Sequence, residues 1–387
     1  FYYIPNESLH LDNIIGNKAS YIETPARVSG NDVFNAWPSI NDWYETIKLN
    51  YGIDYQNGRS THFSPIPDTW KKMTEILLFW AGKGVDGFRC DMAEMVPVEY
   101  WNYAIAQVKR QHPELKFIAE VYNPGEYRNY IHTGGFDYLY DKVGLYDTLR
   151  SIVRGENSAT AITHCWQATD DIQDHMLHFL ENHDEQRIAS PFFVGNAEKA
   201  LPALVVSATL DKAPMMIYAG QEIGEKGMGN EGFSGEDGRT TIFDYWGVPS
   251  YQKLIRGIKY LDKDETKLYT FYRSIIKIIN SSEAIREGKK FDLMYANDAS
   301  QNFNPHRTFA MLRSTGEKTA LIVANFADTE QKLCINIPSA AFEYLGIKPQ
   351  TIKAKELISG KSIPLTLSTT EPTKVTISAN NAVIITF

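Results

Sequence analysis

The sequence predicts an α/β protein built from repeated βαβ units, followed by an all-β domain. Two observations support this fold class. Between about residues 68 and 280, strand-like apolar runs alternate with helical stretches, which is the pattern of parallel βαβ units. After about residue 290, short strand-like runs are separated by turns with no convincing helix between them, which is typical of an antiparallel β-sandwich.

The same shifts in pattern divide the chain into three predicted segments. Residues 1–65 are polar, aromatic and rich in loops, and a loop-rich stretch of that length is usually functional. Residues 66–289 carry the alternating helices and strands, and residues 290–387 form the predicted β domain.

Each element of the α/β segment is predicted from periodicity and end signals. The first helix is predicted over 68–83, because Met73, Ile76 and Trp80 recur at helical spacing and Asp68 is a plausible N-cap. The other helices are expected at residues 97–111, 143–154, 158–173, 197–210 and 265–280. The strands are expected at residues 84–91, 116–121, 136–140, 175–180 and 214–219. A Gly-rich and acidic loop is predicted over 224–249.

Composition excludes several partners. The net charge of −8 over 387 residues argues against nucleic acid, which would require a basic surface. No run of about 20 apolar residues exists, so we expect no membrane partner. A neutral polar substrate fits this composition, whereas the compartment stays open.

Charged side chains follow the predicted strands at the point where each strand ends. Arg89 and Asp91 lie two residues apart and therefore share one face of a strand. Further acidic or histidine side chains follow later strands, namely Glu120, His183, Asp184 and Glu222. The carboxyl ends of parallel strands face the ligand in α/β architectures, so we expect a common pocket there. A purely structural Arg89–Asp91 ion pair is the alternative reading.

Carboxylates accompanied by a His and an Arg favour glycosyl chemistry. That reaction needs one carboxylate to attack the anomeric carbon and a second carboxyl group to protonate the leaving oxygen and then activate water. An arginine keeps the attacking carboxylate ionised through charge-assisted hydrogen bonds.

Several ordered motifs resemble the alpha-amylase family of glycoside hydrolases. They are Gly87-Phe88-Arg89-Cys90-Asp91, Ile118-Ala119-Glu120, Phe179-Leu180-Glu181-Asn182-His183-Asp184 and Tyr218-Ala219-Gly220-Gln221-Glu222. The resemblance implies a (β/α)8 TIM barrel, with strands 4–8 in this chain and a C-terminal β-sandwich.

The resemblance also implies a role for each site residue. Asp91 is the implied nucleophile, Glu120 the general acid/base and Asp184 the stabiliser of the transition state. Arg89 and His183 are the implied contacts to nucleophile and substrate. Tyr122 is a candidate for stacking on a sugar ring, with packing as an equal alternative.

Two departures from the family pattern qualify this resemblance. Glu94-Met95 stands where the family often has Lys-His, which leaves structural calcium open; the chemistry itself is expected to need no cofactor. The family's first signature and the first three barrel strands are also absent. Residues 1–65 therefore resemble the inserted B domain, and we expect the native protein to supply about 100 further N-terminal residues, from the size of the barrel.

The expected function is retaining hydrolysis of α-1,4 bonds in starch, glycogen or maltooligosaccharides, with the two catalytic carboxyls about 5–5.5 Å apart. A glucanotransferase acting on the same substrates is one alternative. A non-catalytic carbohydrate-binding member of the fold is the other.

Overall fold

The chain divides into two compact units. The computed structural model describes residues 1–15, 22–229, 237–243, 247–298 and 302–387. Unit 1 comprises Phe1–Glu120 and Glu126–Asp137, and unit 2 comprises Val121–Gly125 and Tyr138–Phe387. The boundaries at residues 65 and 289 stay predictions. Parts of the predicted loop 224–249 lie outside the described residues.

The first 65 residues of unit 1 are rich in loops, as the sequence predicts. Their short elements are β1 (Tyr3–Ile4), α1 (Asp12–Ile15), β2 (Ala26–Arg27), β3 (Ile53–Asp54) and β4 (Ser60–Thr61). β1 pairs with β2 and β3 with β4, both antiparallel. A small apolar cluster that includes Leu9 and Val28 holds the loops together.

Unit 1 continues with two helix–strand pairs. They are α2 (Asp68–Ala81), β5 (Gly87–Cys90), the 3-10 turn η1 (Ala93–Met95), α3 (Val98–Gln111), β6 (Lys116–Ala119) and the π-turn η2 (Asn129–Thr133). β5 and β6 are parallel, with Gly87 opposite Lys116 and Cys90 opposite Ala119. α3 buries one apolar face, because its buried residues Tyr100, Ala104 and Val108 are four apart.

The predicted apolar face of α2 is only partly buried, which corrects the expectation from periodicity. Trp70, Thr74 and Ala81 are buried, and the Trp70 ring packs against Tyr100 of α3. Ile76 and Trp80 are about half exposed instead, at 49% and 51%. The Trp70 side of the helix packs on α3. Pro67 rather than Asp68 is the N-cap residue.

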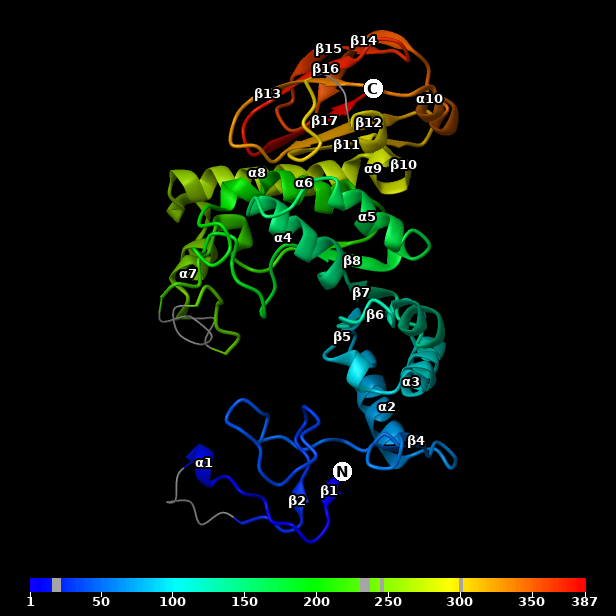
Figure 1. Cartoon of the computed structure of the whole chain (residues 1–387), viewed down its shortest axis with the longest axis vertical. Helices are drawn as coiled ribbons and strands as arrows, with labels where there is room; N and C mark the ends of the chain where they lie inside the picture. Colours follow the sequence, from blue (N-terminus) through cyan, green and yellow to red (C-terminus); the bar gives the residue numbers. More distant parts are fainter. Residues whose placement is uncertain (16–21, 230–236, 244–246, 299–301) are drawn as a thin grey trace. The chain divides into compact units, whose positions relative to one another are not determined.

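The α/β part of unit 2 contains three parallel strands, two of which, β7 and β8, are labelled in Figure 1. These are β7 (Tyr138–Tyr140), β8 (Met176–Phe179) and β9 (Met215–Met216), with Leu139 opposite Met176 and His178 opposite Met215. All four residues of β8 are buried, as expected of a strand covered on both faces.

Helices and helical turns connect and cover these strands. They are η3 (Lys142–Tyr146, a π-turn), α4 (Asp147–Val153), α5 (Ala161–Ala168), η4 (Gln173–His175), η5 (Ala197–Ala200), α6 (Leu201–Thr209), η6 (Gln221–Ile223), α7 (Pro249–Arg256), η8 (Ile258–Tyr260), α8 (Lys263–Ser281) and α9 (Glu283–Glu287).

Several of these helices differ from the predicted bounds: α4 and α6 begin four residues later than predicted, each after a helical turn of another type, and two further differences have local reasons. α8 begins two residues earlier than predicted, because Asp262 and Glu265 form a reciprocal capping box. α5 is shorter than predicted and ends at Ala168, before a run of polar residues. None of the helices in the described part of the chain is long and apolar enough to cross a bilayer.

The C-terminal part of unit 2 is the predicted antiparallel β domain. Its strands are β10 (Lys289–Asp292), β11 (Thr308–Ser314), β12 (Thr319–Asn325), β13 (Gln331–Ile335), β14 (Gln350–Glu356), β15 (Ser362–Leu367), β16 (Thr373–Ile377) and β17 (Asn381–Thr386). One sheet has the order β10-β11-β12-β17-β14-β15, and β13 pairs with β16. Figure 1 shows the sheet lying over α6, α8 and α9.

One helix in this domain was not expected from the sequence. Helix α10 (Ser339–Leu345) follows β13, and a short 3-10 turn, η9 (Met294–Ala296), follows β10. α10 buries Ala341, Phe342 and Leu345 and ends at Gly346, whose positive φ of 67° suits a helix C-terminus. Two features of the sequence could have predicted this helix: the helical spacing of these three apolar residues and the glycine that follows them.

Candidate active site

Arg89 joins two carboxylates at the ends of neighbouring strands in unit 1. Its Nη1 lies 2.8 Å from Oδ1 of Asp91, and its Nη2 lies 3.0 Å from Oε2 of Glu120. Asp91 directly follows β5, and Glu120 directly follows β6. The parallel register of these strands brings both acids to one edge, as the sequence predicts.

The two acids differ sharply in exposure. The Asp91 side chain is 75% exposed, whereas that of Glu120 is 4% exposed. An exposed, ion-paired carboxylate is accessible to a ligand. A buried carboxylate, in contrast, depends on its donors, because an uncompensated buried charge is strongly unfavourable.

The turn after β5 supplies a second donor to Glu120. The Met92 N–H donates to Oε2 of Glu120 at 2.8 Å. Met92 adopts a left-handed conformation with φ 45° and ψ 43°, which is uncommon for a residue other than glycine. The Glu120 backbone also takes part, since its N–H donates to the Cys90 carbonyl and its carbonyl accepts from the Ala93 N–H, both at 3.0 Å.

The cysteine in this motif does not offer a nucleophile. Cys90 is buried, and burial raises the pKa of its thiol to about 12. Because the thiolate is the reactive form of cysteine, the carboxylates are the stronger candidates for attack on a substrate.

His183 and Asp184 form the second group of predicted site residues, in unit 2. They follow β8, and His183 Nε2 lies 3.3 Å from Oδ2 of Asp184. Both side chains are partly exposed, at 29% and 50%. The buried Asn182 shapes the turn, because its Oδ1 accepts from the backbone N–H groups of Asp184 and Glu185, both at 2.9 Å.

A buried ion pair supports this turn and was missed from the sequence. Glu181 and Arg187 are 1% and 0% exposed, and Arg187 Nη1 lies 2.7 Å from Oε2 of Glu181. Arg187 also donates to Thr240 Oγ1 at 2.8 Å, to the Ala219 carbonyl at 2.9 Å and to the Tyr251 hydroxyl at 2.6 Å. Burial raises the pKa of Glu181, which the nearby guanidinium opposes.

A third network holds the residue after Asp184. Lys142, two residues past β7, lies 3.2 Å from Oε1 of Glu185 and 2.8 Å from Oδ1 of Asp147. The Tyr146 hydroxyl donates to the other Glu185 oxygen at 3.1 Å. These contacts hold the side chain of Glu185, the residue that directly follows the His183–Asp184 pair.

The remaining predicted site residues, Tyr122 and Glu222, lie outside the two groups described above. Tyr122 is half-buried in the segment 121–125, which belongs to unit 2, and its stacking role stays a prediction. Glu222 accepts from the Gly220 N–H at 3.0 Å within its own turn. In the part of the chain that the structure describes, no group of three or more His, Cys, Asp or Glu residues is arranged to hold a metal ion.

The structure therefore assembles the predicted site residues in two groups. Arg89, Asp91 and Glu120 are brought together in unit 1, and His183 and Asp184 are brought together in unit 2. The acidic residues lie at the carboxyl ends of parallel strands, and a β domain follows these strands in the chain. These features are typical of α/β-barrel proteins, whose functional sites lie at the carboxyl ends of the strands.

Comparison with known proteins shows which members of that class this chain is similar to. Residues 64–245 match the family model of the alpha-amylase catalytic domain. Alpha-amylase 3 of Dictyoglomus thermophilum is 27% identical over 245 residues, covering 58% of this chain and 48% of the relative. A maltosyltransferase of Cereibacter sphaeroides, named for α-1,4-glucan and maltose 1-phosphate, is 34% identical over 91 residues, covering 22% and 15%.

The solved structures agree on the fold. The maltogenic alpha-amylase AmyB of Thermotoga neapolitana superposes with a TM-score of 0.63 at 20% identity, covering 87% of this chain and 72% of that one. The fold is therefore a partial TIM barrel with a β-rich C-terminal domain, and residues 64–245 of the chain are similar to the catalytic domain of the alpha-amylase family. The chain spans less than half the length of the two curated relatives named above.

Proposed function

We propose that this chain carries the catalytic acids of a retaining hydrolase of α-1,4-linked glucans such as starch, glycogen and maltooligosaccharides. The single observation that carries the proposal is the contact of one guanidinium, that of Arg89, with both Asp91 and Glu120 at adjacent strand ends. The match to the alpha-amylase catalytic domain and the similarity to Alpha-amylase 3 support the choice of substrate.

The first half of the proposed reaction forms a bond between sugar and enzyme. The Asp91 carboxylate attacks the anomeric carbon, and the bond from that carbon to the glycosidic oxygen breaks. The Glu120 carboxyl group gives its proton to the departing oxygen. Arg89 keeps Asp91 ionised and therefore nucleophilic.

The second half releases the sugar. The Glu120 carboxylate, now without its proton, takes a proton from water, and the water oxygen attacks the anomeric carbon and displaces Asp91. Burial disfavours a charged Glu120, whereas Arg89 and the Met92 N–H stabilise that charge. These opposing effects suit a group that must carry a proton in one half of the cycle and not in the other.

Asp184 is proposed to stabilise the positive charge that develops on the sugar ring, with His183 binding a substrate hydroxyl. Their partial exposure supports contact with a ligand, and the buried Asn182 holds the turn that presents them. The reaction as written needs water and carboxyl groups only, so we propose no cofactor for the chemistry.

Substitution of the proposed nucleophile tests the function. In the full-length protein, Asp91→Asn should lower kcat on maltoheptaose by at least about 10³-fold, the scale on which loss of a covalent nucleophile acts. Asp86→Asn, at the exposed position directly before β5, is the matched control and should behave as wild type. Circular dichroism should show both variants folded.

Two outcomes would contradict the proposal. Turnover by Asp91→Asn at the wild-type rate would remove the nucleophile assignment. No turnover of any glucan by the full-length wild type would favour the non-catalytic alternative.

Glucan transfer is the second candidate, because part of the chain is similar to a maltosyltransferase. A sugar hydroxyl would then replace water in the second half of the reaction. Chromatography of the products from maltoheptaose separates the two functions, since transfer yields chains longer than the substrate and hydrolysis yields only shorter ones.

A further inference from the structure

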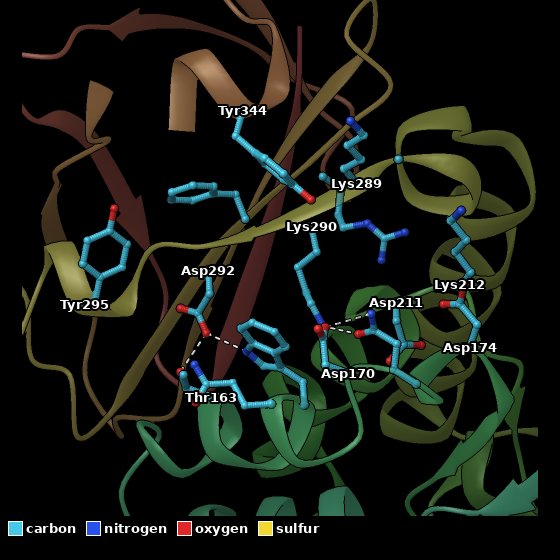
Figure 2. A pocket seen from close by; sticks show the side chains of 16 residues that line it. Thr163, Asp170, Asp174, Asp211, Lys212, Lys289, Lys290, Asp292, Tyr295 and Tyr344 are labelled. Carbon is cyan, nitrogen blue, oxygen red and sulfur yellow. Dashed lines mark hydrogen bonds between the residues drawn. The ribbon is translucent and has the colours of Figure 1, made fainter. Parts of the chain in front are cut away.

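A cavity of about 560 Å³ lies within unit 2, where the barrel part meets the β domain. α5 and the η4 turn line one side, and β10 and α10 line the other (Figure 2). Its volume falls in the range of about 300–1,000 Å³ that small-ligand sites occupy. None of the proposed catalytic residues lines this C-terminal cavity.

Exposed aromatic rings line the β-domain side of the C-terminal cavity. Tyr344 of α10 is 55% exposed, and Tyr295 of the turn after β10 is 61% exposed. The Phe291 ring lies 6.1 Å from that of Tyr344 and 6.2 Å from that of Tyr295, measured between centroids. Figure 2 shows both tyrosines beside the cavity. Large exposed rings next to a polar cavity offer faces for the C–H side of a sugar.

The opposite wall of the cavity is polar and ordered. Asp292 Oδ2 accepts from Trp166 Nε1 at 2.8 Å and from Thr163 Oγ1 at 2.7 Å, as Figure 2 shows. Lys290 donates to Gln173 Oε1 at 2.5 Å, and its Nζ lies 4.1 Å from the centre of the Trp166 ring. These side chains are held in place before any ligand binds.

The charges of the lining residues balance. Among the described lining residues, the acids are Asp170, Asp174, Asp211 and Asp292. The bases among them are Lys212, Lys289, Lys290 and Arg313. A lining with equal numbers of both signs favours neither an anion nor a cation, whereas a neutral ligand with many hydroxyl groups can use both kinds of partner.

One lining residue, Arg313, has a buried donor atom without a hydrogen-bond acceptor in the described part of the chain. Its side chain is 1% exposed, Nη1 donates to the Thr209 carbonyl at 3.0 Å, and Nη2 donates to the Ile285 carbonyl at 2.6 Å. Its Nε has no hydrogen-bond partner among the described residues. A buried donor of this kind is costly without an acceptor, and because Nε is itself buried, a ligand hydroxyl can accept from it only if the Arg313 side chain shifts toward the cavity.

We propose that the C-terminal cavity binds a short neutral α-glucan, as a carbohydrate site separate from the acids that cleave the substrate. The aromatic rings stack on sugar faces, and the balanced polar wall binds hydroxyl groups. The choice of an α-glucan rests on the proposed function. The site would hold a segment of the substrate chain next to the barrel part of unit 2.

Hydrogen exchange with maltoheptaose as the probe tests this site. In the full-length Asp91→Asn protein, the probe should slow amide exchange in residues 288–296 and 339–345. Tyr344→Ala, and separately Tyr295→Ala, should raise the Kd for this protection at least ten-fold. Tyr260→Ala removes a tyrosine that is also half exposed, lies outside the cavity, and is the matched control.

The results separate this proposal from the proposed function. The cavity site is overturned, even if the wild type hydrolyses glucans, when the two segments show no protection or when both tyrosine variants bind the probe as tightly as the parent Asp91→Asn protein does. Tyrosine-dependent protection in a protein that hydrolyses no glucan supports the cavity site and overturns the proposed function.

Discussion

Arg89 is the residue on which the proposed chemistry depends most. The spacing of Arg89 and Asp91 predicts their ion pair from the sequence alone, because residues two apart share a strand face. The contact of the same guanidinium with Glu120 depends on the parallel register of β5 and β6, which no local pattern encodes. The left-handed turn at Met92 escaped prediction for the same reason, since its N–H donates to that distant carboxylate.

Arg89→Met should affect both stability and activity. The buried Glu120 would lose its guanidinium partner, which we expect to lower the free energy of unfolding by about 2 kcal/mol. We also expect kcat to fall by at least about 100-fold with a smaller change in KM, because an ionised Asp91 matters in the transition state. Urea denaturation and steady-state kinetics measure the two effects.

Two variants control this prediction. Arg110→Met removes an exposed arginine from the last turn of α3 and should leave both quantities unchanged. Arg89→Lys keeps the charge and should recover part of the activity. An Arg89→Met protein with wild-type kcat would show that the ion pairs are only structural.

Lys290 offers a test of the electrostatics at residue scale. Burial lowers the pKa of Lys290 to about 8, from the ordinary lysine value of 10.5. Between these two pH values the unfolded chain binds a proton that the native chain does not bind, so stability rises with pH. Relative to Lys290→Met, the wild type should gain up to about 3 kcal/mol in free energy of unfolding across that window.

Denaturant titrations of wild type and Lys290→Met at several pH values measure this gain. Lys289→Met removes a neighbouring exposed charge and is the matched control. Parallel stability curves for wild type and Lys290→Met would contradict a buried lysine at this position.

At the scale of elements, periodicity predicted the order of strands and helices but not which faces are covered. The strands β5 to β9 appear in the predicted places, each shorter than predicted. The apolar side of α2 that contains Ile76 and Trp80 was expected in the core, whereas Trp70 faces α3 instead. Periodicity reports an apolar stripe, and the neighbouring elements decide how much of that stripe is buried.

The turn after β8 shows how one side chain can join several elements. Arg187 contacts Glu181, the Ala219 carbonyl after β9, Thr240 and Tyr251 of α7. The sequence motif contains Glu181 but gives no sign of this partner, because the contacts to Ala219, Thr240 and Tyr251 span more than 30 positions.

Arg187→Met should therefore destabilise unit 2 strongly. A buried carboxylate left without its cation typically costs about 3–5 kcal/mol, and we expect a loss in that range. The double variant Glu181→Leu/Arg187→Met should recover part of the loss, because it removes both charges. Urea denaturation followed by tryptophan fluorescence measures each free energy.

The exposed pair of Lys318 and Glu283 provides the comparison. Lys318→Met breaks a contact of 2.7 Å between side chains that are 64% and 45% exposed, and we expect no measurable change in stability. A loss for Arg187→Met as small as that for Lys318→Met would show that the buried network contributes little.

At the scale of the whole molecule, composition alone argued against nucleic acid as a partner and for a neutral polar substrate. A net charge of −8 repels polyanions and leaves a neutral glucan unaffected at long range. The family comparison and the parallel strands then specified the fold. The contact of Arg89 with both carboxylates, in contrast, could be seen only in the structure, because it depends on the register of two strands.

The salt dependence of substrate use is the corresponding test. Because a neutral chain carries no charge to be screened, KM for maltoheptaose should change less than about two-fold between low and high sodium chloride, across a several-fold fall in Debye length. A sulfated maltooligosaccharide of the same length is the control, and its apparent Ki as an inhibitor should depend on salt, because screening weakens its repulsion by the protein. A strongly salt-dependent KM for maltoheptaose itself would indicate that charge, rather than hydroxyl recognition and ring stacking, governs how this protein selects its substrate.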